Sequence, residues 1–385
     1  MKTELKTALI MGVVVVGAIV GAATYFSTLE NPKEIKQNQL NEKAPAEPVG
    51  QTPSTQVEKK SIVPLIDKSH FKKAPDLIGI TGYVNTSPEE LKANMKDKVV
   101  LYDFWTYSCI NCIRTLPYLT AWNEKYADKG LLIIGVHSPE FEFEKDINNV
   151  KMAVEKYGIK YPVVLDSNMQ TWNAFDNRYW PRHYLTDSEG YIRHDHIGEG
   201  GYAETEKQIQ GLLEERSKIL GINVAAAQPL VNLEEPTFME SQTPELYFGY
   251  KFVLGRNYLG NPEGFKPEQS VTYVLPKDLQ RDNFYLEGKW LNLEDRMRLE
   301  LESGKIVLPY YAKAVNIVAA NNSDLQILLD GVSVDPKDSG TDVKDGKMHV
   351  SEDRLYNIIT SSQAGMHTLT ILAKPGFEIY TFTFG

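Results

Sequence analysis

The 385-residue chain contains two cysteines, Cys109 and Cys112, in the stretch "VVLYDFWTYSCINCIRTLPYL". A disulfide between them closes so short a loop that it restrains almost nothing in the unfolded chain, so stability explains the pair poorly. Two thiols at this spacing can instead exchange a disulfide with another molecule and then close on each other. We therefore predict redox chemistry; a zinc site completed by His194 and His196, and two unrelated core cysteines, are the alternatives.

The pair lies where a predicted buried strand, residues 98–105, gives way to a predicted helix, residues 109–126. Unpaired N–H groups and the dipole at the start of a helix stabilise an anion, and the thiolate is the species that attacks a disulfide. The second cysteine lies one helical turn further on. We therefore assign Cys109 as the exposed nucleophile and Cys112 as the partly buried resolving thiol.

Strand and helix patterns alternate along residues 62–221, which indicates an α/β layer architecture. The unbroken apolar strands are typical of a sheet that is covered on both faces. Besides the strand and helix at the cysteine pair, we expect strands at 131–138 and 161–166, helices at 146–157 and 203–220, and a hairpin at 182–197.

The helix pattern disappears after a predicted linker at residues 222–238. Over residues 239–385, short strands of alternating hydrophobicity follow one another, separated by turn signals such as "NN", "DG" and "PG". This order predicts a separate all-β domain, built as an antiparallel sandwich.

Residues 8–26 carry no charge and follow Lys2 and Lys6. A run of this length can cross a bilayer with the lysines on the cytoplasmic side, so we predict a membrane anchor at residues 1–27 and a flexible linker at 28–61. The alternative is a cleaved signal, which would give a secreted protein. Both interpretations place the remaining domains outside the cytoplasm.

The charge balance bears on the class of partner. The formal net charge is −10, and binding to nucleic-acid phosphates needs clustered lysine and arginine. We therefore predict no nucleic-acid partner.

The segment "YDFWTYSCINC" resembles the active site of the thioredoxin superfamily, and the wider stretch is similar to its TlpA-like branch. The resemblance is greatest to the extracytoplasmic part of DipZ-type thiol–disulfide interchange proteins, because "TPELYFGY" and "YTFTFG" resemble the sandwich that follows thioredoxin there. It implies a thioredoxin-like α/β domain over residues 62–221. It also implies an all-β, galactose-binding-like jelly roll over residues 239–385.

Residue by residue, the resemblance implies a redox disulfide between Cys109 and Cys112. Pro181, in "RYWPRHYL", matches the cis-proline that lies opposite the redox pair in this fold, where it leaves the backbone of Trp180 free to bind an extended peptide. Trp105 joins Trp180 and Pro181 in the predicted substrate-binding set. An ordinary proline at the start of a strand is the alternative for Pro181.

Two acids complete the predicted catalytic set. Asp103 matches the buried acid of thioredoxins, which takes the proton of the resolving cysteine; the alternative is a hydrogen-bonded carboxylate at the end of a strand. Glu140, in "GVHSPEF", matches a glutamate near the pair in TlpA-like proteins, and the alternative is a solvated loop acid. The catalytic set is therefore Cys109, Cys112, Asp103 and Glu140, with no metal and no cofactor.

The sequence departs from the family pattern around the pair. Ser108 stands where thioredoxins usually carry tryptophan, and Ile110-Asn111 replaces the usual Gly-Pro between the cysteines, which leaves the redox potential open. Full DipZ proteins also carry a multi-span electron-transfer domain. This chain would therefore need a separate membrane electron donor.

We predict a membrane-anchored, extracytoplasmic thiol–disulfide oxidoreductase that serves cell redox homeostasis by exchanging disulfides with disulfide-containing or dithiol proteins. A protein-disulfide reductase is preferred to an oxidase. One alternative is a surface module that binds a glycan or a partner, with a secondary redox domain; the other is a thiol peroxidase. The aromatic side chains considered for stacking on a sugar are Trp290, Tyr310, Tyr311 and Tyr356.

Overall fold

The computed structural model describes residues 67–223, 229–233 and 241–385. They belong to one compact unit, Ile62–Gly385. The predicted anchor and the linker that follows it lie outside the described residues, as does most of the predicted linker at 222–238. Within the part of the chain that the structure describes, no helix combines the length and the apolar character needed to span a membrane.

A six-stranded mixed sheet forms the centre of the α/β region, residues 67–223, with the strand order β1-β4-β3-β2-β5-β6. The pairs β2–β3 and β3–β4 are parallel, and the pairs β1–β4, β2–β5 and β5–β6 are antiparallel. The strands are β1 (Gly82–Val84), β2 (Val99–Trp105), β3 (Leu131–His137), β4 (Val163–Leu165), β5 (Arg182–Thr186) and β6 (Ile192–Ile197). The predicted α/β architecture is therefore confirmed.

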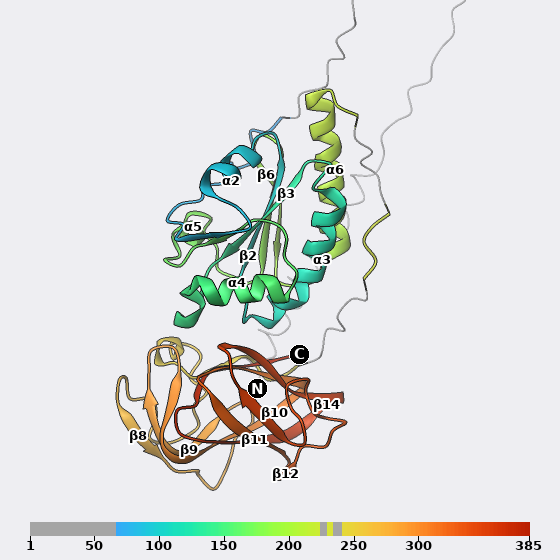
Figure 1. The fold of residues 1–385 in the computed structure, drawn as a ribbon. Coiled ribbons are helices and arrows are strands. Elements are labelled where there is room, and N and C mark those ends of the chain that lie inside the picture. The colour runs from blue at the N-terminus through green and yellow to red at the C-terminus, as the bar shows by residue number, and fades with distance from the viewer. Residues whose placement is uncertain (1–66, 224–228, 234–240) are drawn as a thin grey trace, which may run out of the picture. The chain divides into compact units, whose positions relative to one another are not determined.

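Helices cover both faces of this sheet (Figure 1). One face packs on α3, α4 and α6, and the opposite face packs on α2 and α5. Every residue of β2, in the middle of the sheet, is buried, as the unbroken apolar run predicts. The helices are α2 (Pro88–Asn94), α3 (Ile110–Tyr126), α4 (Ile147–Lys156), α5 (Gln170–Ala174) and α6 (Tyr202–Leu220), with a short 3-10 helix at Glu142–Lys145.

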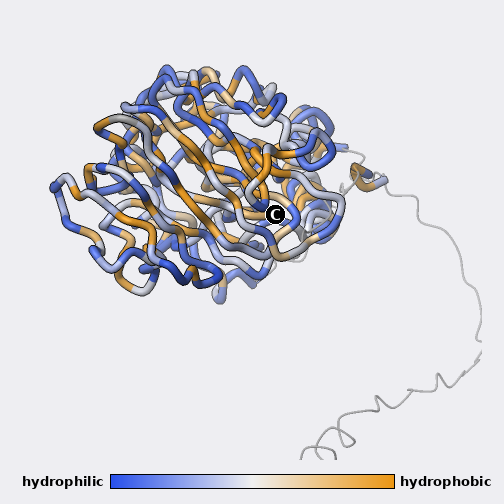
Figure 2. Tube along the Cα trace, turned by 90° about the horizontal axis from the view of Figure 1, so that it is seen from below, coloured by the Kyte–Doolittle hydropathy of each residue, from blue (hydrophilic) through white to orange (hydrophobic). Residues whose placement is uncertain are grey.

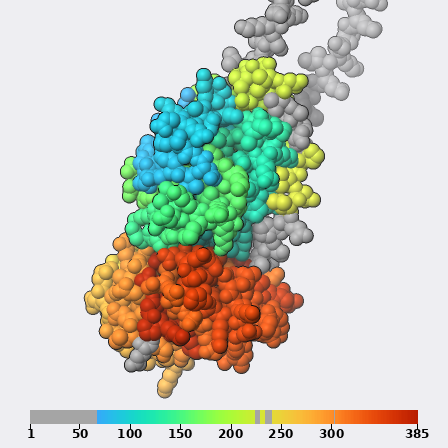
Figure 3. Space-filling view, in the orientation of Figure 1, coloured from blue at the N-terminus to red at the C-terminus, as the bar shows by residue number. Residues whose placement is uncertain are grey.

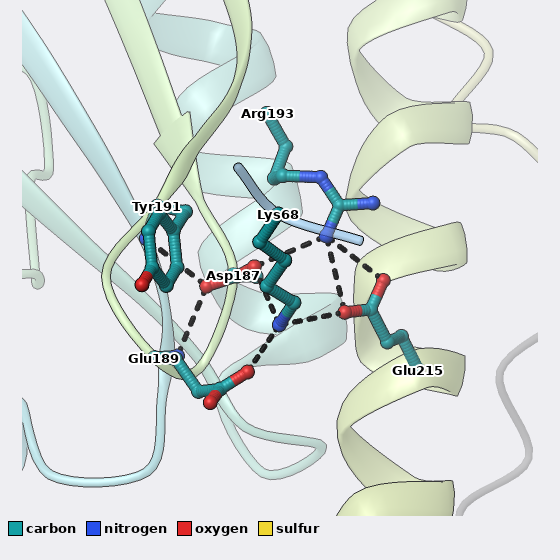
Figure 4. Close-up of polar contacts among 6 residues, drawn as sticks. All are labelled: Lys68, Asp187, Glu189, Tyr191, Arg193 and Glu215. Atoms are coloured by element: carbon teal, nitrogen blue, oxygen red, sulfur yellow. Dashed lines mark hydrogen bonds and ion pairs between the residues drawn. The ribbon is translucent and has the colours of Figure 1, made fainter. Parts of the chain in front are cut away.

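A cluster of ion pairs ties the start of the α/β region to the β5–β6 hairpin and to α6 (Figure 4). Lys68 Nζ lies 2.9 Å from Asp187 and 3.1 Å from Glu215, and Arg193 Nη1 lies 3.0 Å from each of the same two carboxylates. Asp187 is 1% exposed and also accepts the backbone N–H of Tyr191 at 3.0 Å. The buried carboxylate of Asp187 therefore binds two cations and a backbone N–H at the turn of the hairpin.

The balance of these contacts sets the charge of Asp187. Burial alone would raise the pKa of this carboxyl, but the bonds from Lys68, from the Tyr191 N–H and from Arg193 outweigh burial and lower the pKa below its ordinary value. The stabilisation is therefore present above the pKa of the unfolded chain and is lost as the pH falls through the lowered pKa.

Asp187→Asn should lower the free energy of unfolding at pH 7 by about 3 kcal/mol, because it leaves Lys68 and Arg193 partly buried with one partner fewer. Urea unfolding of the full chain measures this loss. Asp176→Asn is the matched control, since Asp176 and its partner Arg178 are 84% and 73% exposed and should contribute less than about 1 kcal/mol. Equal losses in the two variants would contradict a structural role for the buried cluster.

The β region, residues 241–385, forms one continuous nine-stranded antiparallel sheet that encloses its own core. Hydrophobic residues (orange) run along its long central strands, while hydrophilic residues (blue) occupy the peripheral loops (Figure 2). The strands are β7 (Leu246–Tyr247), β8 (Ser270–Tyr273), β9 (Tyr285–Asn292), β10 (Met297–Ala320), β11 (Ser323–Leu329), β12 (Val332–Ser333), β13 (Lys347–Val350), β14 (Arg354–Ala373) and β15 (Glu378–Phe384), with a 3-10 helix at Tyr250–Phe252. The all-β prediction is confirmed.

The aromatic side chains considered for sugar stacking do not line a sugar site. Trp290, Tyr310 and Tyr356 are 0% exposed and belong to the core of the β region, and Tyr311 is half-buried. A ring inside the core cannot stack on a sugar in solvent. The structure therefore contradicts the stacking role proposed for Trp290, Tyr310 and Tyr356.

Candidate active site

Cys109 and Cys112 lie at the start of α3, directly after the loop that follows β2. Cys109 is the N-cap of the helix, and its Sγ accepts the backbone N–H of Cys112 at 3.3 Å. Cys109 is partly exposed, whereas Cys112 is 1% exposed. The first thiol is therefore accessible to another molecule and the second is covered.

The Cys112 thiol lies in an environment that disfavours its anion. Burial raises its pKa well above the ordinary value, the neighbouring Cys109 raises it further, and the charge of Asp103 contributes in the same direction. Cys112 therefore keeps its proton until a base removes it.

Asp103 and Trp105 lie on β2, beneath the start of α3, and both are fully inside the protein, at 1% and 0% exposed. Asp103 Oδ1 lies 3.3 Å from Nε2 of His183, a residue of β5 that is also 1% exposed. The ring of Trp105 packs edge-on against the ring of His137. The burial of Trp105 contradicts the predicted contact between this side chain and a substrate.

Trp180 and Pro181 immediately precede β5 and are joined by a cis peptide bond. Trp180 is partly buried; its ring packs on Trp172 with centroids 4.2 Å apart, and its Nε1 donates to the carbonyl of Ser138 at 3.0 Å. Trp180 lines the same small cavity as Cys109. The predicted substrate-binding backbone is thus held beside the accessible thiol.

This cavity, of about 60 Å³, is bounded by both regions of the compact unit, which pack against each other (Figure 3). The packing between the regions is aromatic: the ring of Phe141 contacts the rings of Tyr247 and Tyr380. The cavity is lined by Ser108, Cys109, Asn111, Glu140, Phe141 and Trp180 from the α/β region and by Glu245, Tyr247, Val318, Thr381 and Thr383 from the β region.

Glu140 meets the β region through the hydroxyl of Tyr247. This hydroxyl lies 2.8 Å from Glu140 Oε1 and 3.1 Å from Glu245 Oε2. A tyrosine hydroxyl has one hydrogen to donate, so it can serve one carboxylate only. For both contacts to be hydrogen bonds, one of the two carboxyls must carry a proton of its own.

The pKa values of both carboxyls are raised, so this pair of acids retains a proton near neutral pH. Burial, followed by the negative charges of Glu245 and Glu144, raises the pKa of Glu140 to about 8, against a smaller opposing effect of the Tyr247 hydrogen bond. Near neutral pH Glu140 is therefore largely protonated. Burial raises the pKa of Glu245 as well, so this carboxyl also tends to keep a proton, and the Tyr247 hydroxyl lies between the two acids.

Glu144 holds this corner of the site together, and the sequence analysis missed it. It is 0% exposed; its Oε1 accepts the Ser108 hydroxyl at 2.5 Å, and its Oε2 accepts the backbone N–H groups of Glu140 and Phe141 at 2.7 and 2.9 Å. Glu144 thus joins the residue before Cys109 to the loop that carries Glu140. The run "EFEFEK", in which acids alternate with phenylalanines, gave no local signal that one of these acids is buried.

Glu140→Gln should flatten the pH dependence of stability. Because folding raises the pKa of Glu140, the folded wild type holds this proton more tightly than the unfolded chain, and stability is lost as the pH rises towards 8. Glutamine keeps a donor at all pH values, so between pH 6 and 9 the wild type should lose about 2 kcal/mol more free energy of unfolding than the variant.

Urea unfolding of the full chain at several pH values measures this difference. Glu142→Gln is the control, because the Glu142 side chain is 69% exposed and should leave the pH dependence as in the wild type. Parallel curves for wild type and Glu140→Gln would show that the Glu140 proton does not stabilise the fold.

The described residues contain no group of three or more His, Cys, Asp or Glu side chains placed to hold a metal ion. His194 and His196, the predicted alternative zinc ligands, lie on β6, and their rings face each other with centroids 6.5 Å apart.

Two family models match the chain: "Redoxin" over residues 72–213 and "Thioredoxin like C-terminal domain" over residues 243–385. Protein DipZ of Mycobacterium bovis is 36% identical over 323 residues, which cover 81% of this chain and 43% of that protein. The chain thus spans less than half of the length of this relative.

Two shorter relatives match part of the chain. Thiol-disulfide oxidoreductase YkuV of Bacillus subtilis is 31% identical over 143 residues, which cover 37% of this chain and 94% of that protein. Thiol-disulfide oxidoreductase ResA of Bacillus thuringiensis is 30% identical over 146 residues, which cover 37% of this chain and 76% of that protein.

Proposed function

Because the chain belongs to the thioredoxin-like family of thiol–disulfide oxidoreductases, we propose that it exchanges disulfides with protein partners through Cys109 and Cys112. The observation that carries the proposal is the inequality of the two thiols. Cys109 caps α3 and is accessible, while Cys112 is buried one turn behind it and keeps its proton. A nucleophile and a resolving thiol need this difference.

In the reducing direction, the Cys109 thiolate attacks one sulfur of a partner disulfide, and the other sulfur leaves with the electron pair. Asp103 then takes the proton of Cys112, and the Cys112 thiolate attacks Cys109 Sγ. The Cys109–Cys112 disulfide forms, the mixed disulfide breaks, and the second partner sulfur leaves as a thiolate. The partner has gained two electrons and the pair has lost two.

The surroundings of Cys109 favour a protein disulfide on an extended segment over a small hydroperoxide. The backbone beside Pro181 can pair with an extended chain, and Trp180 forms the wall on that side. Glu140 is a protonated acid next to the thiol, so it can supply a proton to a leaving sulfur. Tyr247 holds Glu140 from the β region, which gives that region a part in the redox site.

The finer parts of the proposal concern the place of the protein and its architecture. In this proposal, residues 1–27 form a single-pass anchor in the cell membrane, with the domains outside the cytoplasm. A separate membrane protein supplies the electrons. The finer parts also include a galactose-binding-like jelly roll as the class of the β region, and domain limits at 62–221, 222–238 and 239–385.

Cys112→Ser should trap mixed disulfides between Cys109 and partner proteins, because the resolving attack is lost. Cys109→Ser should abolish exchange altogether, because the accessible nucleophile is lost. Non-reducing gels and mass spectrometry of the full chain after reaction with oxidised glutathione, and then with disulfide-containing proteins, read out both effects. Turnover of Cys112→Ser at the wild-type rate would reverse the assigned roles.

The direction of electron flow can be tested on the couple itself. For a reductase we expect a reduction potential near about −270 mV, the value of thioredoxin, measured by equilibrating the full chain in glutathione buffers of defined ratio. A potential near about −120 mV, typical of strong oxidants, would instead make the protein a disulfide donor. The Cys109→Ser, Cys112→Ser double variant is the blank.

A further inference from the structure

Asp103, His183 and His196 lie side by side across three neighbouring strands. Asp103 on β2 is the register partner of His183 on β5, and His183 is the register partner of His196 on β6. Register partners point to the same face of a sheet. Asp103 Oδ1 lies 3.3 Å from His183 Nε2, and the rings of His183 and His196 stack with centroids 6.2 Å apart. The three side chains form a row that begins next to Cys112.

Five buried polar atoms of this row lack an aligned hydrogen bond to a described residue, although Asp103 Oδ1 and His183 Nε2 lie 3.3 Å from each other. Both carboxylate oxygens of Asp103, both ring nitrogens of His183 and Nε2 of His196 are buried without an aligned hydrogen bond to a described residue. Leaving such atoms unpaired is costly, so buried histidines that only support a fold normally have bonded ring nitrogens. His137 is an example in this chain, since its Nε2 lies 3.4 Å from the hydroxyl of Thr106.

The row ends near the surface at His196, which is half-buried. Its ring packs against the backbone of Gly201, where an added Cβ would lie 2.6 Å from the ring carbon Cε1. His194 lies on the same strand two residues earlier, but its Nε2 is 3.2 Å from the hydroxyl of Thr205, and its register partner is Leu185 rather than His183. His196 is thus the outer end of the row, and His194 is outside it.

From this geometry we infer that His183 and His196 form a proton relay that connects the buried Asp103 with solvent. The inference rests on the proposed function. In each cycle the proton of Cys112 Sγ passes to Asp103 Oδ1, and from there to His183 Nε2. His183 releases a proton from Nδ1 through a bridging water to His196 Nε2, and His196 passes it to solvent. The charge on Asp103 is thereby restored for the next cycle.

The relay provides a path by which the proton can leave the buried Asp103. Asp103 is 1% exposed, so water has little direct access to its carboxyl in the folded protein. A neutral imidazole accepts a proton on one nitrogen and releases one from the other. Burial, and then the neighbouring His183, lower the pKa of His196, which keeps this ring neutral and ready to accept at neutral pH.

The test follows a single turnover of the reduced full chain with oxidised glutathione at low buffer concentration. Acid quenching and mass spectrometry separate the adduct on Cys109 from the closed Cys109–Cys112 disulfide. In His196→Ala the adduct should form at the wild-type rate, but its resolution should slow about 10-fold, a fraction of the roughly 10²–10⁴-fold that positioned acid–base groups contribute. Added imidazole should restore the rate, because it can enter where the half-buried ring was.

Two further variants separate the relay from a structural effect. His194→Ala removes an imidazole from the same strand and the same face and should behave as the wild type. His183→Gln should slow resolution without rescue, because that position is 1% exposed and added imidazole cannot reach it.

Each remaining outcome contradicts the relay. Resolution in His196→Ala at the wild-type rate removes His196 from the path, and slow resolution that imidazole does not restore points to a structural role. If the wild type forms no glutathione adduct at all, the proposed redox function fails, and this result is distinct from a failure of the relay alone.

Discussion

The burial of β2 on both faces is the constraint on which the active site depends. A one-residue slip of a strand covered on both sides would exchange the side chains that pack against the two helical layers, so packing on both faces fixes the end of β2 in space. The loop after this strand carries the cysteine pair, and the strand itself carries Asp103 on the face beneath α3. The same packing that stabilises the sheet therefore sets the position of the accessible thiol relative to its buried neighbours.

Buried acids perform three different tasks around this strand. Asp187 is held as a charged carboxylate by two cations and closes the β5–β6 hairpin. Glu144 accepts one hydroxyl and two backbone N–H groups and so fixes the loop beside Cys109. Glu140 shares a tyrosine hydroxyl with another carboxyl and keeps a proton. The cations and N–H groups around Asp187 outweigh its burial and lower its pKa, whereas burial outweighs the donors at Glu144 and Glu140 and raises theirs.

Local patterns in the sequence predict the elements that position the thiols. The apolar run of β2, the helix that starts at the cysteine pair and the β5–β6 hairpin all lie where they are expected, because each follows from a period or a turn signal within a few residues. β1 and α5 are too short to show a period. β10 is longer than the short strands that the pattern predicts, because it continues through a bulge between Ala312 and Ala314.

Contacts between distant parts of the chain could not be predicted in the same way. Glu144 reaches Ser108 across 36 positions, and Tyr247 reaches Glu140 across 107 positions, so no local pattern links them. Trp105 was assigned to the substrate-binding set, but its place on a central strand buries it. The pairing of His183 with His196 could have been predicted, because the hairpin turn sets the register of the two strands. The histidines of β6 were considered only as metal ligands.

The hydroxyl of Tyr247 links two equilibria: the packing of β7 against the α/β region and the binding of a proton by Glu140. If the contact with the β region favours the protonated acid, then protonation favours the contact by the same free energy. A partner that draws Tyr247 away from Glu140 would therefore remove a hydrogen bond and the nearby Glu245 together, and would change the acidity beside Cys109 without touching either cysteine. The contact between Tyr247 and Glu140 thus gives the β region a direct physical link to the surroundings of Cys109.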